Sequence, residues 1–267
     1  MTKHEIITLA EKFVLGSAGN YISEKNALSP DYVGMKIFDS PIFAFGSPDD
    51  EIYLKYKSAD VIGSHFLLPQ QWLEGAKTVV SFFLPYNQRV KSANSAHFDW
   101  PADEWLHARY EGQLFLKELL VYLQSVFADA GAKSIISIND EKFKSGNNGN
   151  RFTSNWSERH AAYACGLGTF GLSKGLITEK GVCGRYGSII TELNLPKDVR
   201  RYTGIYDYCN MCGMCIKNCP ANAISAETGK NDLLCSDFLD NVHTKNNPRY
   251  GCGKCQVGVP CESGVPK

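Results

Sequence analysis

Residues 209–220 read CNMCGMCIKNCP, with cysteines at Cys209, Cys212, Cys215 and Cys219 and a proline directly after the last one. This is the C-x2-C-x2-C-x3-C-P spacing of bacterial iron–sulfur ligation. The first three thiolates can hold one [4Fe-4S] cluster within a short loop, and the fourth ligates a second cluster. The run therefore predicts two clusters and requires four more cysteines downstream.

Four further cysteines follow the run, so that eight of the ten cysteines lie between residues 209 and 261. They are Cys235, Cys252, Cys255 and Cys261. Two clusters with all-cysteine ligation need eight thiolates. The spacing alone predicts that one later cysteine completes the first cluster and that the other three join Cys219 on the second.

Two other uses of a cysteine-rich tail are disfavoured. Disulfide frameworks are typical of secreted chains, and residues 1–19 do not resemble a signal peptide, because Glu5 and Glu11 interrupt them. Structural zinc sites usually take two separated pairs of ligands. Three cysteines within seven residues, followed by a fourth before proline, fit clusters better.

Charge and hydropathy narrow the range of partners. The 267 residues carry 28 basic and 28 acidic side chains, and a nucleic-acid surface usually shows a basic excess. No apolar stretch reaches the length of a membrane span. We therefore expect a cytoplasmic protein without a membrane or nucleic-acid partner.

The cysteine content changes near Pro196, which predicts two domains, residues 1–195 and 196–267. Apolar periodicity in the first part predicts helices over 4–18, 102–130 and 157–165 and strands over 78–84, 134–138 and 188–193. Alternating strands and helices indicate an α/β (α+β) layered domain. The polar stretches 87–101 and 139–155 are predicted as long loops that could border a pocket.

A glycine motif follows the third predicted helix. Gly166, Leu167, Gly168, Thr169, Phe170 and Gly171 match G-x-G-x-x-G. A dinucleotide fingerprint must follow a strand and open a helix, and this motif follows a helix instead. The glycines are therefore expected to end the helix and to let the backbone turn tightly or approach a large ligand.

The motifs together resemble a known family. Glu158-Arg159, the following ACGLGTFG run, the strand that ends in Leu84-Pro85-Tyr86 and the cysteine-rich tail are similar to epoxyqueuosine reductases and reductive dehalogenases. The resemblance covers roughly residues 70–262. It implies a nitroreductase-like layered core, a ferredoxin-like double-cluster module, and cobalamin reduced by electrons from two [4Fe-4S] clusters.

The resemblance also implies site residues. One cluster would take Cys209, Cys212, Cys215 and Cys261. The other would take Cys219, Cys235, Cys252 and Cys255. Cofactor-binding residues would be Gly166, Leu167, Gly168, Thr169 and Gly171. Candidate catalytic residues are Glu158, Arg159 and His160, for which a salt-bridged first helical turn and a packed histidine are the alternatives.

One departure affects the substrate. Epoxyqueuosine reductases carry a proton-donating acid six positions before the Glu of their Glu-Arg pair, and this chain has Phe152 there. We therefore expect a small or nucleoside-like substrate other than epoxyqueuosine, and a low-potential donor of the ferredoxin or flavodoxin type. The alternative is an electron-transfer or corrinoid-handling accessory protein without activity of its own. A large cavity beside residues 166–171 and next to a cluster would favour the enzyme, and a filled one the carrier.

Overall fold

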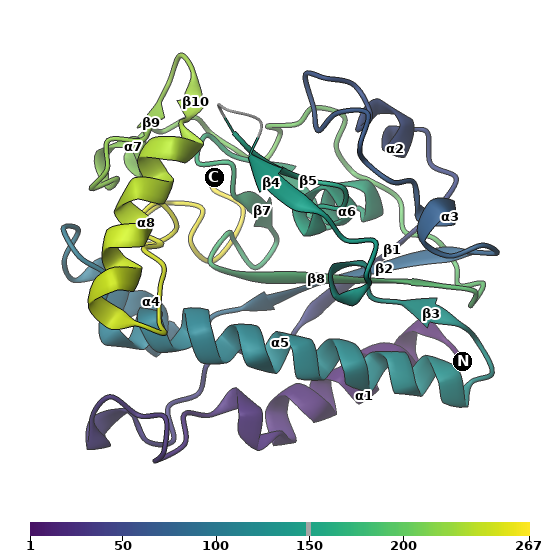
Figure 1. Ribbon diagram of the computed structural model, residues 1–267, viewed down its shortest axis with the longest axis horizontal. Helices are drawn as coiled ribbons and strands as arrows, with labels where there is room; N and C mark the ends of the chain where they lie inside the picture. The colour runs from purple at the N-terminus through teal and green to yellow at the C-terminus, as the bar shows by residue number, and fades with distance from the viewer. Residues whose placement is uncertain (148–150) are drawn as a thin grey trace.

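A four-stranded antiparallel sheet organises the computed structural model, which describes residues 1–147 and 151–267 (Figure 1). The strand order is β1-β2-β8-β3. The strands are β1 (Ile42–Gly46), β2 (Thr78–Pro85), β8 (Gly184–Thr191) and β3 (Ser134–Ile135). β2 pairs with β8 along its whole length, from Thr78 opposite Thr191 to Pro85 opposite Gly184.

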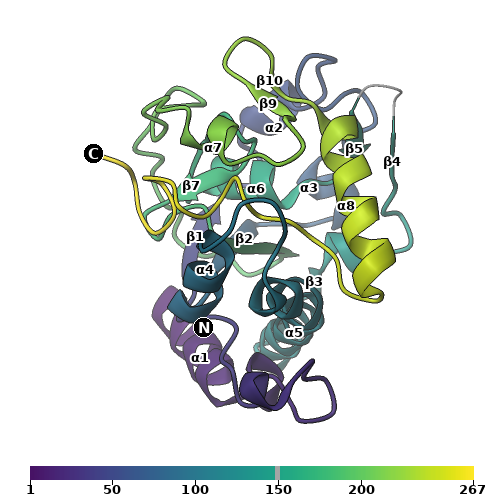
Figure 2. The same ribbon diagram turned by 90° about the vertical axis from the view of Figure 1, so that its left-hand side faces the viewer.

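The sheet lies between two helical layers (Figure 2). One face is covered by α1 (Lys3–Gly16) and α5 (Asp103–Asp129). The other face is covered by α6 (Glu158–Cys165), with the short helices α2 (Ile52–Lys55) and α3 (Pro69–Trp72) nearby. Short 3-10 turns complete this part of the chain: η1 (Ala18–Asn20), η2 (Pro30–Tyr32) and η3 (Ser137–Asn139).

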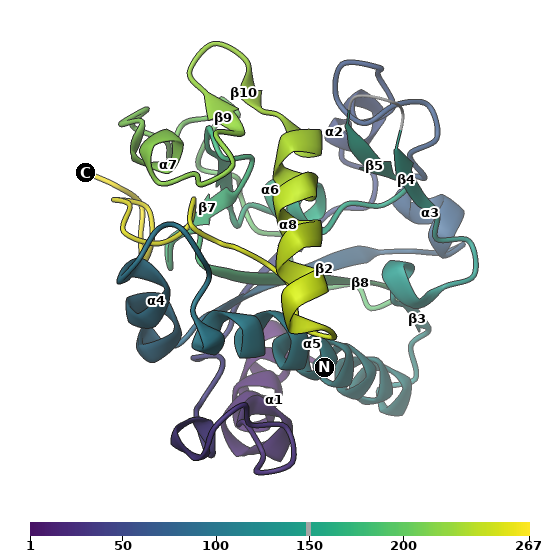
Figure 3. The ribbon, with the colours of Figure 1, turned by 60° about the vertical axis from the view of Figure 1, so that its left-hand side comes forward.

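The helices and strands of the C-terminal segment, residues 196–267, lie at one end of the sheet (Figure 3). Its elements are α7 (Met214–Lys217), β9 (Ile224–Ser225), β10 (Gly229–Lys230) and α8 (Asp232–Asn246). α8 runs from the β9–β10 hairpin towards α5. The first residues of the segment lie along the core, because Asp198 accepts hydrogen bonds from the Phe45 N–H at 2.8 Å and from Lys3 Nζ at 2.6 Å.

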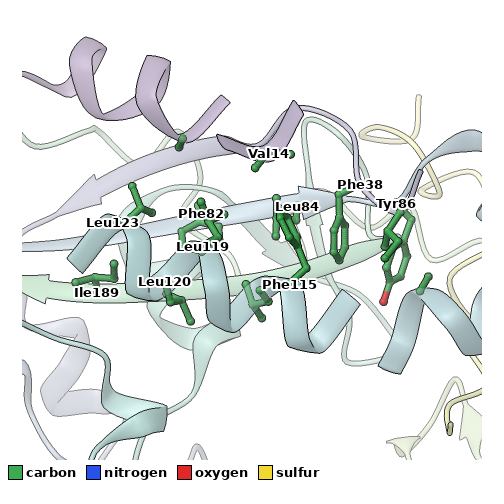
Figure 4. Packing of buried hydrophobic residues seen from close by; sticks show 14 of the residues in the cluster. Val14, Phe38, Phe82, Leu84, Tyr86, Phe115, Leu119, Leu120, Leu123 and Ile189 are labelled. Atoms are coloured by element: carbon green, nitrogen blue, oxygen red, sulfur yellow. The ribbon is translucent and has the colours of Figure 1, made fainter. Parts of the chain in front are cut away.

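Side chains of β2 point alternately to the two faces of the sheet and contribute to the core on both sides, since every residue of this strand is buried. Val80, Phe82 and Leu84 join the cluster beneath α1 and α5, whereas Val79 joins the cluster on the α6 face. Figure 4 shows the first cluster, in which leucines of α5 pack against β2 and β8. Burial of these apolar side chains therefore holds α1 and α5 on one face of the sheet and α6 on the other.

Most of the predicted elements are confirmed. The predicted helices over 4–18, 102–130 and 157–165 correspond to α1, α5 and α6, and α1 begins with a capping box between Thr2 and Glu5. Gly131 ends α5 with φ +76°. The strand predicted over 134–138 is wrong beyond Ile135, because Ile136 turns into the core and a 3-10 turn follows.

The two predicted loops contain secondary structure. Residues 87–101 include α4 (Gln88–Ser95), which begins where the Asn87 side chain accepts the Arg89 N–H. Residues 139–155 include a hairpin of β4 (Ser145–Asn147) and β5 (Phe152–Ser154), and the predicted loop residues 148–150 lie outside the described residues. A further hairpin, β6 (Gly168–Phe170) with β7 (Leu176–Thr178), follows α6. The nitroreductase-like type of layering stays a prediction.

Candidate functional site

Four of the predicted cluster ligands line one cavity of about 490 Å³ between the C-terminal segment and the sheet. They are Cys219, Cys235, Cys252 and Cys255. Burial raises the pKa of Cys255, and the thiols of Cys235 and Cys219 add to the shift. Burial likewise raises the pKa of Cys252 to about 12, with contributions from Cys255 and Cys235. Such coupling between like charges requires that the sulfur atoms lie near one another.

The other four predicted ligands form a second group. Burial raises the pKa of Cys261 to about 12, and Cys209, Cys215 and Cys212 add to the shift. Cys212 is exposed, so this group reaches the protein surface. Cys255 also adds to the raised pKa of Cys215, so the two groups lie beside one another, and their division into two ligand sets stays a prediction. Within residues 1–147 and 151–267, no three His, Cys, Asp or Glu side chains are arranged to hold a single metal ion.

The ligand loop, residues 249–255, packs against the first half of α5. Gly251 has φ +111°, and a Cβ there would lie 2.7 Å from Arg109 Cγ. Gly253 has φ +65°, and a Cβ there would lie 1.8 Å from Trp105 Cζ2. Both positions therefore need glycine, because the backbone is left-handed and the helix side chains fill the space.

A buried ion pair fixes the start of the ligand loop. Arg249 donates to Glu111 at 2.6 Å and to the Asn26 carbonyl at 2.5 Å. The same carboxylate lies 3.2 Å from His107 Nδ1, and His107 Nε2 accepts the Leu28 N–H at 3.2 Å. Nε2 is thus the acceptor, so Nδ1 carries the proton and donates to Glu111.

A second anchor lies between two of the predicted ligands. Lys254 is 1% exposed, and its ammonium donates to the Asn94 carbonyl, the Asn94 side chain and the His97 carbonyl, at 2.7, 2.9 and 2.6 Å. Asn94 in turn donates to the Cys252 carbonyl at 2.9 Å. Burial lowers the pKa of Lys254 to about 8. This network from α4 holds the Cys252–Cys255 turn in place.

A larger cavity, of about 1200 Å³, adjoins the first one. Residues from α2, β5, α6, β6 and the C-terminal segment line it. Arg159, Lys230, Cys235 and Leu239 line both cavities. Pockets for small molecules usually enclose about 300–1,000 Å³, so this one has room for a large ligand beside a predicted cluster ligand.

Glu158 faces the smaller cavity. Neither of its carboxyl oxygens is solvent-accessible or has a hydrogen-bond partner. Burial raises the pKa of Glu158 to about 8, and only the nearby Ser188 hydroxyl opposes the shift. The carboxyl is therefore mostly protonated at neutral pH and can act as a proton donor.

The next two residues of α6 reach the larger cavity. Arg159 lines both cavities and donates to the Lys174 carbonyl. His160 lines the larger cavity, and its Nδ1 lies 2.8 Å from Ser157 Oγ. Burial, with a smaller contribution from Arg159, lowers the pKa of His160 to about 3. The imidazole is therefore neutral at neutral pH, and a role as a charged acid is disfavoured.

Comparisons with known proteins agree with these features. Residues 202–225, which contain the CNMCGMCIKNCP run, match the model of a 4Fe-4S binding domain. The chain is 26% identical over 219 residues to an epoxyqueuosine reductase of Bacillus anthracis, covering 74% of this chain and 51% of that protein. It is 33% identical over 112 residues to a tetrachloroethene reductive dehalogenase of Desulfitobacterium hafniense, covering 39% and 20%. These matches support membership of the chain in the family of epoxyqueuosine reductases and reductive dehalogenases.

Solved structures of epoxyqueuosine reductases and reductive dehalogenases share the fold. An epoxyqueuosine reductase with an epoxyqueuosine-modified tRNA stem loop aligns with a TM-score of 0.54 at 20% identity, over 99% of this chain and 66% of that one. A reductive dehalogenase described with a mechanism for B12-dependent dehalogenation aligns with a TM-score of 0.52 at 18% identity, over 84% and 30%. The chain spans about half of the length of the reductase relatives it matches.

The comparisons bear on the expected partners. The expectation that nucleic acid is not a partner is not supported, because a structural neighbour was solved with a tRNA stem loop. Neutral formal charge was a weak argument, since it averages over the whole surface. No helix in residues 1–147 and 151–267 is both long and apolar enough to cross a bilayer.

The glycine motif of the chain lies between the larger cavity and the exposed cysteine group. Gly166 ends α6 with φ 101°, as predicted. Leu167, Gly168 and Thr169 are buried, and Thr169 Oγ1 accepts the Tyr208 N–H at 2.8 Å. Among the described residues of the motif, Phe170 and Gly171 line the larger cavity. A Cβ on Gly171 would lie 3.6 Å from Cys209 Sγ, so the motif also borders the first cysteine group.

The sequence analysis missed several residues of the site. Lys230 lines both cavities; burial opposes its charge, but the thiols of Cys255 and Cys235 outweigh that effect and raise its pKa. Trp105 lies in the predicted helix 102–130, whose periodicity indicates no more than a core position, yet it lines the smaller cavity. The sequence signal for these contacts is the pattern CGKC at 252–255. Gly253 between two predicted ligands is consistent with a closely packed neighbour, and Lys254 with a nearby hydrogen-bond acceptor.

Proposed function

We propose that this protein is an iron–sulfur oxidoreductase in which two [4Fe-4S] clusters pass low-potential electrons to a cofactor in the larger cavity. The observation that carries the proposal is Cys235, which lines both the cysteine cavity and the larger cavity. A redox cofactor in the larger cavity would thus lie beside a cluster ligand. We also propose that the chain divides at residue 196 into a cofactor-binding domain and a cluster-binding domain.

The cysteines support the cluster half of the proposal. The buried group of Cys219, Cys235, Cys252 and Cys255 would hold one cluster beside the larger cavity. The group of Cys209, Cys212, Cys215 and Cys261 would hold the other. Because Cys212 is exposed, the second of these clusters is the natural entry point for a donor of the ferredoxin or flavodoxin type.

We propose cobalamin as the cofactor of the larger cavity. The lining fits a large ligand with amide and charged groups, since it offers aromatic faces such as Phe170 and Tyr206 and the cations of Arg159, Lys174 and Lys230. Of the predicted cofactor-binding residues, Gly171 lines the cavity, while Gly166, Leu167, Gly168 and Thr169 would support it from behind. Bound cobalamin would supply a reducible cobalt centre for the chemistry.

The chain's own residues would orient the reactants and move protons. Arg159 lies between the cavities and would hold an anionic group of the cofactor or substrate. Glu158 keeps a proton at neutral pH and would hold it at the wall of the cluster cavity, next to Arg159. His160 stays neutral and would bind through its ring or its free nitrogen.

A small or nucleoside-like molecule is the proposed substrate. Phe152, which occupies the position of the proton-donating acid in epoxyqueuosine reductases, lines the larger cavity. This side chain disfavours epoxyqueuosine itself. The same observation favours the second candidate, a corrinoid-handling accessory protein that binds the cofactor without turnover.

An anaerobic titration of the iron–sulfur-reconstituted protein with cobalamin tests the proposal. We expect about eight irons per chain and a saturable shift to the base-off spectrum. Lys174→Met, which removes a cation from the cavity lining, should weaken binding, whereas Lys36→Met outside it should not. Eight irons without a spectral shift would overturn the cobalamin assignment and leave a two-cluster electron carrier. A shift without turnover of any electron acceptor would favour the accessory protein.

A further inference from the structure

The smaller cavity gathers buried polar atoms that have no hydrogen-bond partner. Among the described residues, such atoms occur in Tyr86, Trp105, Glu158 and Gln256, all of which line this cavity. The remaining ones lie elsewhere, in Tyr53, Trp72 and Ser137. Buried polar groups without a partner cost free energy, and a cluster of them around one cavity indicates a bound group that satisfies them.

Trp105 gives the clearest indication of what that group is. Its side chain is 1% exposed, and its indole N–H can only donate a hydrogen bond. Gly253, which lies between two predicted ligands, packs on the same indole: a Cβ there would lie 2.1 Å from Trp105 Cε2, the ring atom bonded to the nitrogen. The N–H is therefore held beside the turn from Cys252 to Cys255.

Tyr86 provides a second donor at the same place. Its ring meets Trp105 edge to face at 5.1 Å, and its hydroxyl is buried without a partner. Figure 4 shows Tyr86 at the end of the apolar core cluster, beyond Phe38. Burial raises the pKa of Tyr86, so the hydroxyl keeps its proton. Gln256 offers an acceptor and Glu158 can accept or donate, so neither of them identifies the missing partner.

We propose that the Trp105 indole N–H and the Tyr86 hydroxyl donate hydrogen bonds to sulfur of the cluster held by Cys219, Cys235, Cys252 and Cys255, and so raise its reduction potential. The inference rests on the proposed function, because it requires that cluster. Sulfur is the acceptor that four converging thiolates would bring into this cavity. Hydrogen bonds to cluster sulfur are one of the factors that set the potential, since they stabilise the more negative, reduced state.

The pair of donors would make the buried cluster a better electron acceptor than it would be without them. That cluster lies beside the larger cavity, because its ligand Cys235 lines both cavities. The donors would therefore favour the electron on the cluster next to the cofactor.

Trp105→Phe tests the proposal because it removes the N–H and keeps an aromatic ring. Trp72→Phe is the matched control, since Trp72 also has a buried indole N–H without a partner but lines neither cavity. The readout is the potential of each cluster in an anaerobic redox titration followed by electron paramagnetic resonance. We expect Trp105→Phe to make reduction of one cluster about tenfold less favourable, a shift of about −59 mV for one electron, with eight irons retained. The other cluster and the control should not change.

Tyr86→Phe keeps the test decisive if Trp105→Phe loses iron, since it deletes a single oxygen atom. Its matched control is Tyr53→Phe, which removes another buried hydroxyl without a partner. A fall in the potential of one cluster in Tyr86→Phe alone would support the proposal. Unchanged potentials in both cavity variants, with eight irons bound, would overturn it and leave the proposed function intact. Only four irons in the unsubstituted protein would overturn both.

Discussion

The sheet with its helices and the C-terminal segment are stabilised in different ways. α5 buries apolar side chains along its whole length, whereas α8, with 15 residues, buries only Val242. The described part of the C-terminal segment buries few other apolar side chains: Tyr202, Ala223, Ile224, Val257 and Val259. Its attachment depends on polar anchors such as Arg249 and Lys254. A segment with so small a core needs another source of stability, and metal ligation supplies it in small domains.

The largest effect should come from removing a ligand, because metal binding is folding energy in such a segment. We expect Cys212→Ala to lose one cluster, about four of eight irons, and to lose the order of the surrounding segment while the sheet remains folded. Iron analysis and hydrogen exchange in α8 compared with α5 measure this. Cys183→Ala, a buried cysteine outside both groups, is the control and should retain eight irons. Eight irons in Cys212→Ala would contradict the ligand assignment.

The next effect concerns the buried anchor of the ligand loop. Glu111→Gln should destabilise the protein by about 3–5 kcal/mol, because it leaves the Arg249 guanidinium buried without its counter-charge. Lys36→Met is the comparison, since the Lys36–Asp39 pair at 3.0 Å is partly exposed and should contribute less than about 1 kcal/mol. Anaerobic urea unfolding of both variants gives the two values. An equal loss of unfolding free energy in Glu111→Gln and Lys36→Met would show that the buried ion pair stabilises the protein no more than the exposed one.

A smaller effect is expected from the glycine beneath Trp105. Gly253→Ala combines a left-handed backbone with a Cβ 1.8 Å from the ring, so we expect a loss of about 3 kcal/mol. Gly16→Ala, at the end of α1 with no atom within 4 Å of the added Cβ, should change the stability by less than about 1 kcal/mol. The same urea unfolding measures both. A neutral Gly253→Ala would mean that the ligand loop can move away from α5.

The apolar periodicity of the sequence predicted those helices and strands whose pattern is complete within one segment of the chain. The strand of residues 78–84 and the helix of residues 102–130 have strong periodicity, and both are confirmed. β8 begins at Gly184, earlier than predicted, because its glycines look unlike a strand in the sequence. Packing against the neighbouring strand requires glycine here, because a Cβ on Gly187 would lie 2.5 Å from the Phe82 ring. β1 was missed because its five residues are too short to show a clear period.

Only the cysteine part of the site could be predicted, because its signal is a fixed spacing along the chain. The cysteine run indicates candidate ligands directly, and their assignment stays a prediction. The cavities could not be predicted, because they form between segments that are far apart in the sequence, such as Ile52, His160 and Cys235. The role of Trp105 was hidden for the same reason, since its apolar position on α5 reads as core and its contact with Gly253 crosses about 150 residues of chain.

The last expected effect depends on pH and lies at the boundary between the two regions, where Glu158 faces the cysteine cavity. Its pKa is about 8 in the folded protein and 4.5 in an ordinary environment, so the folded state holds a proton that the unfolded state releases. The stabilisation is fully present below pH 4.5 and is lost as the pH rises through 8, at about 1.4 kcal/mol per pH unit. Glu158→Gln has no such proton, so its stability should change less between pH 5 and 8. Anaerobic urea unfolding at each pH tests this, with the exposed Glu24→Gln as a control that should keep the original slope. An unchanged slope in Glu158→Gln would mean that the carboxyl finds a partner or water in the cavity, and its role as a proton donor would lose its physical basis.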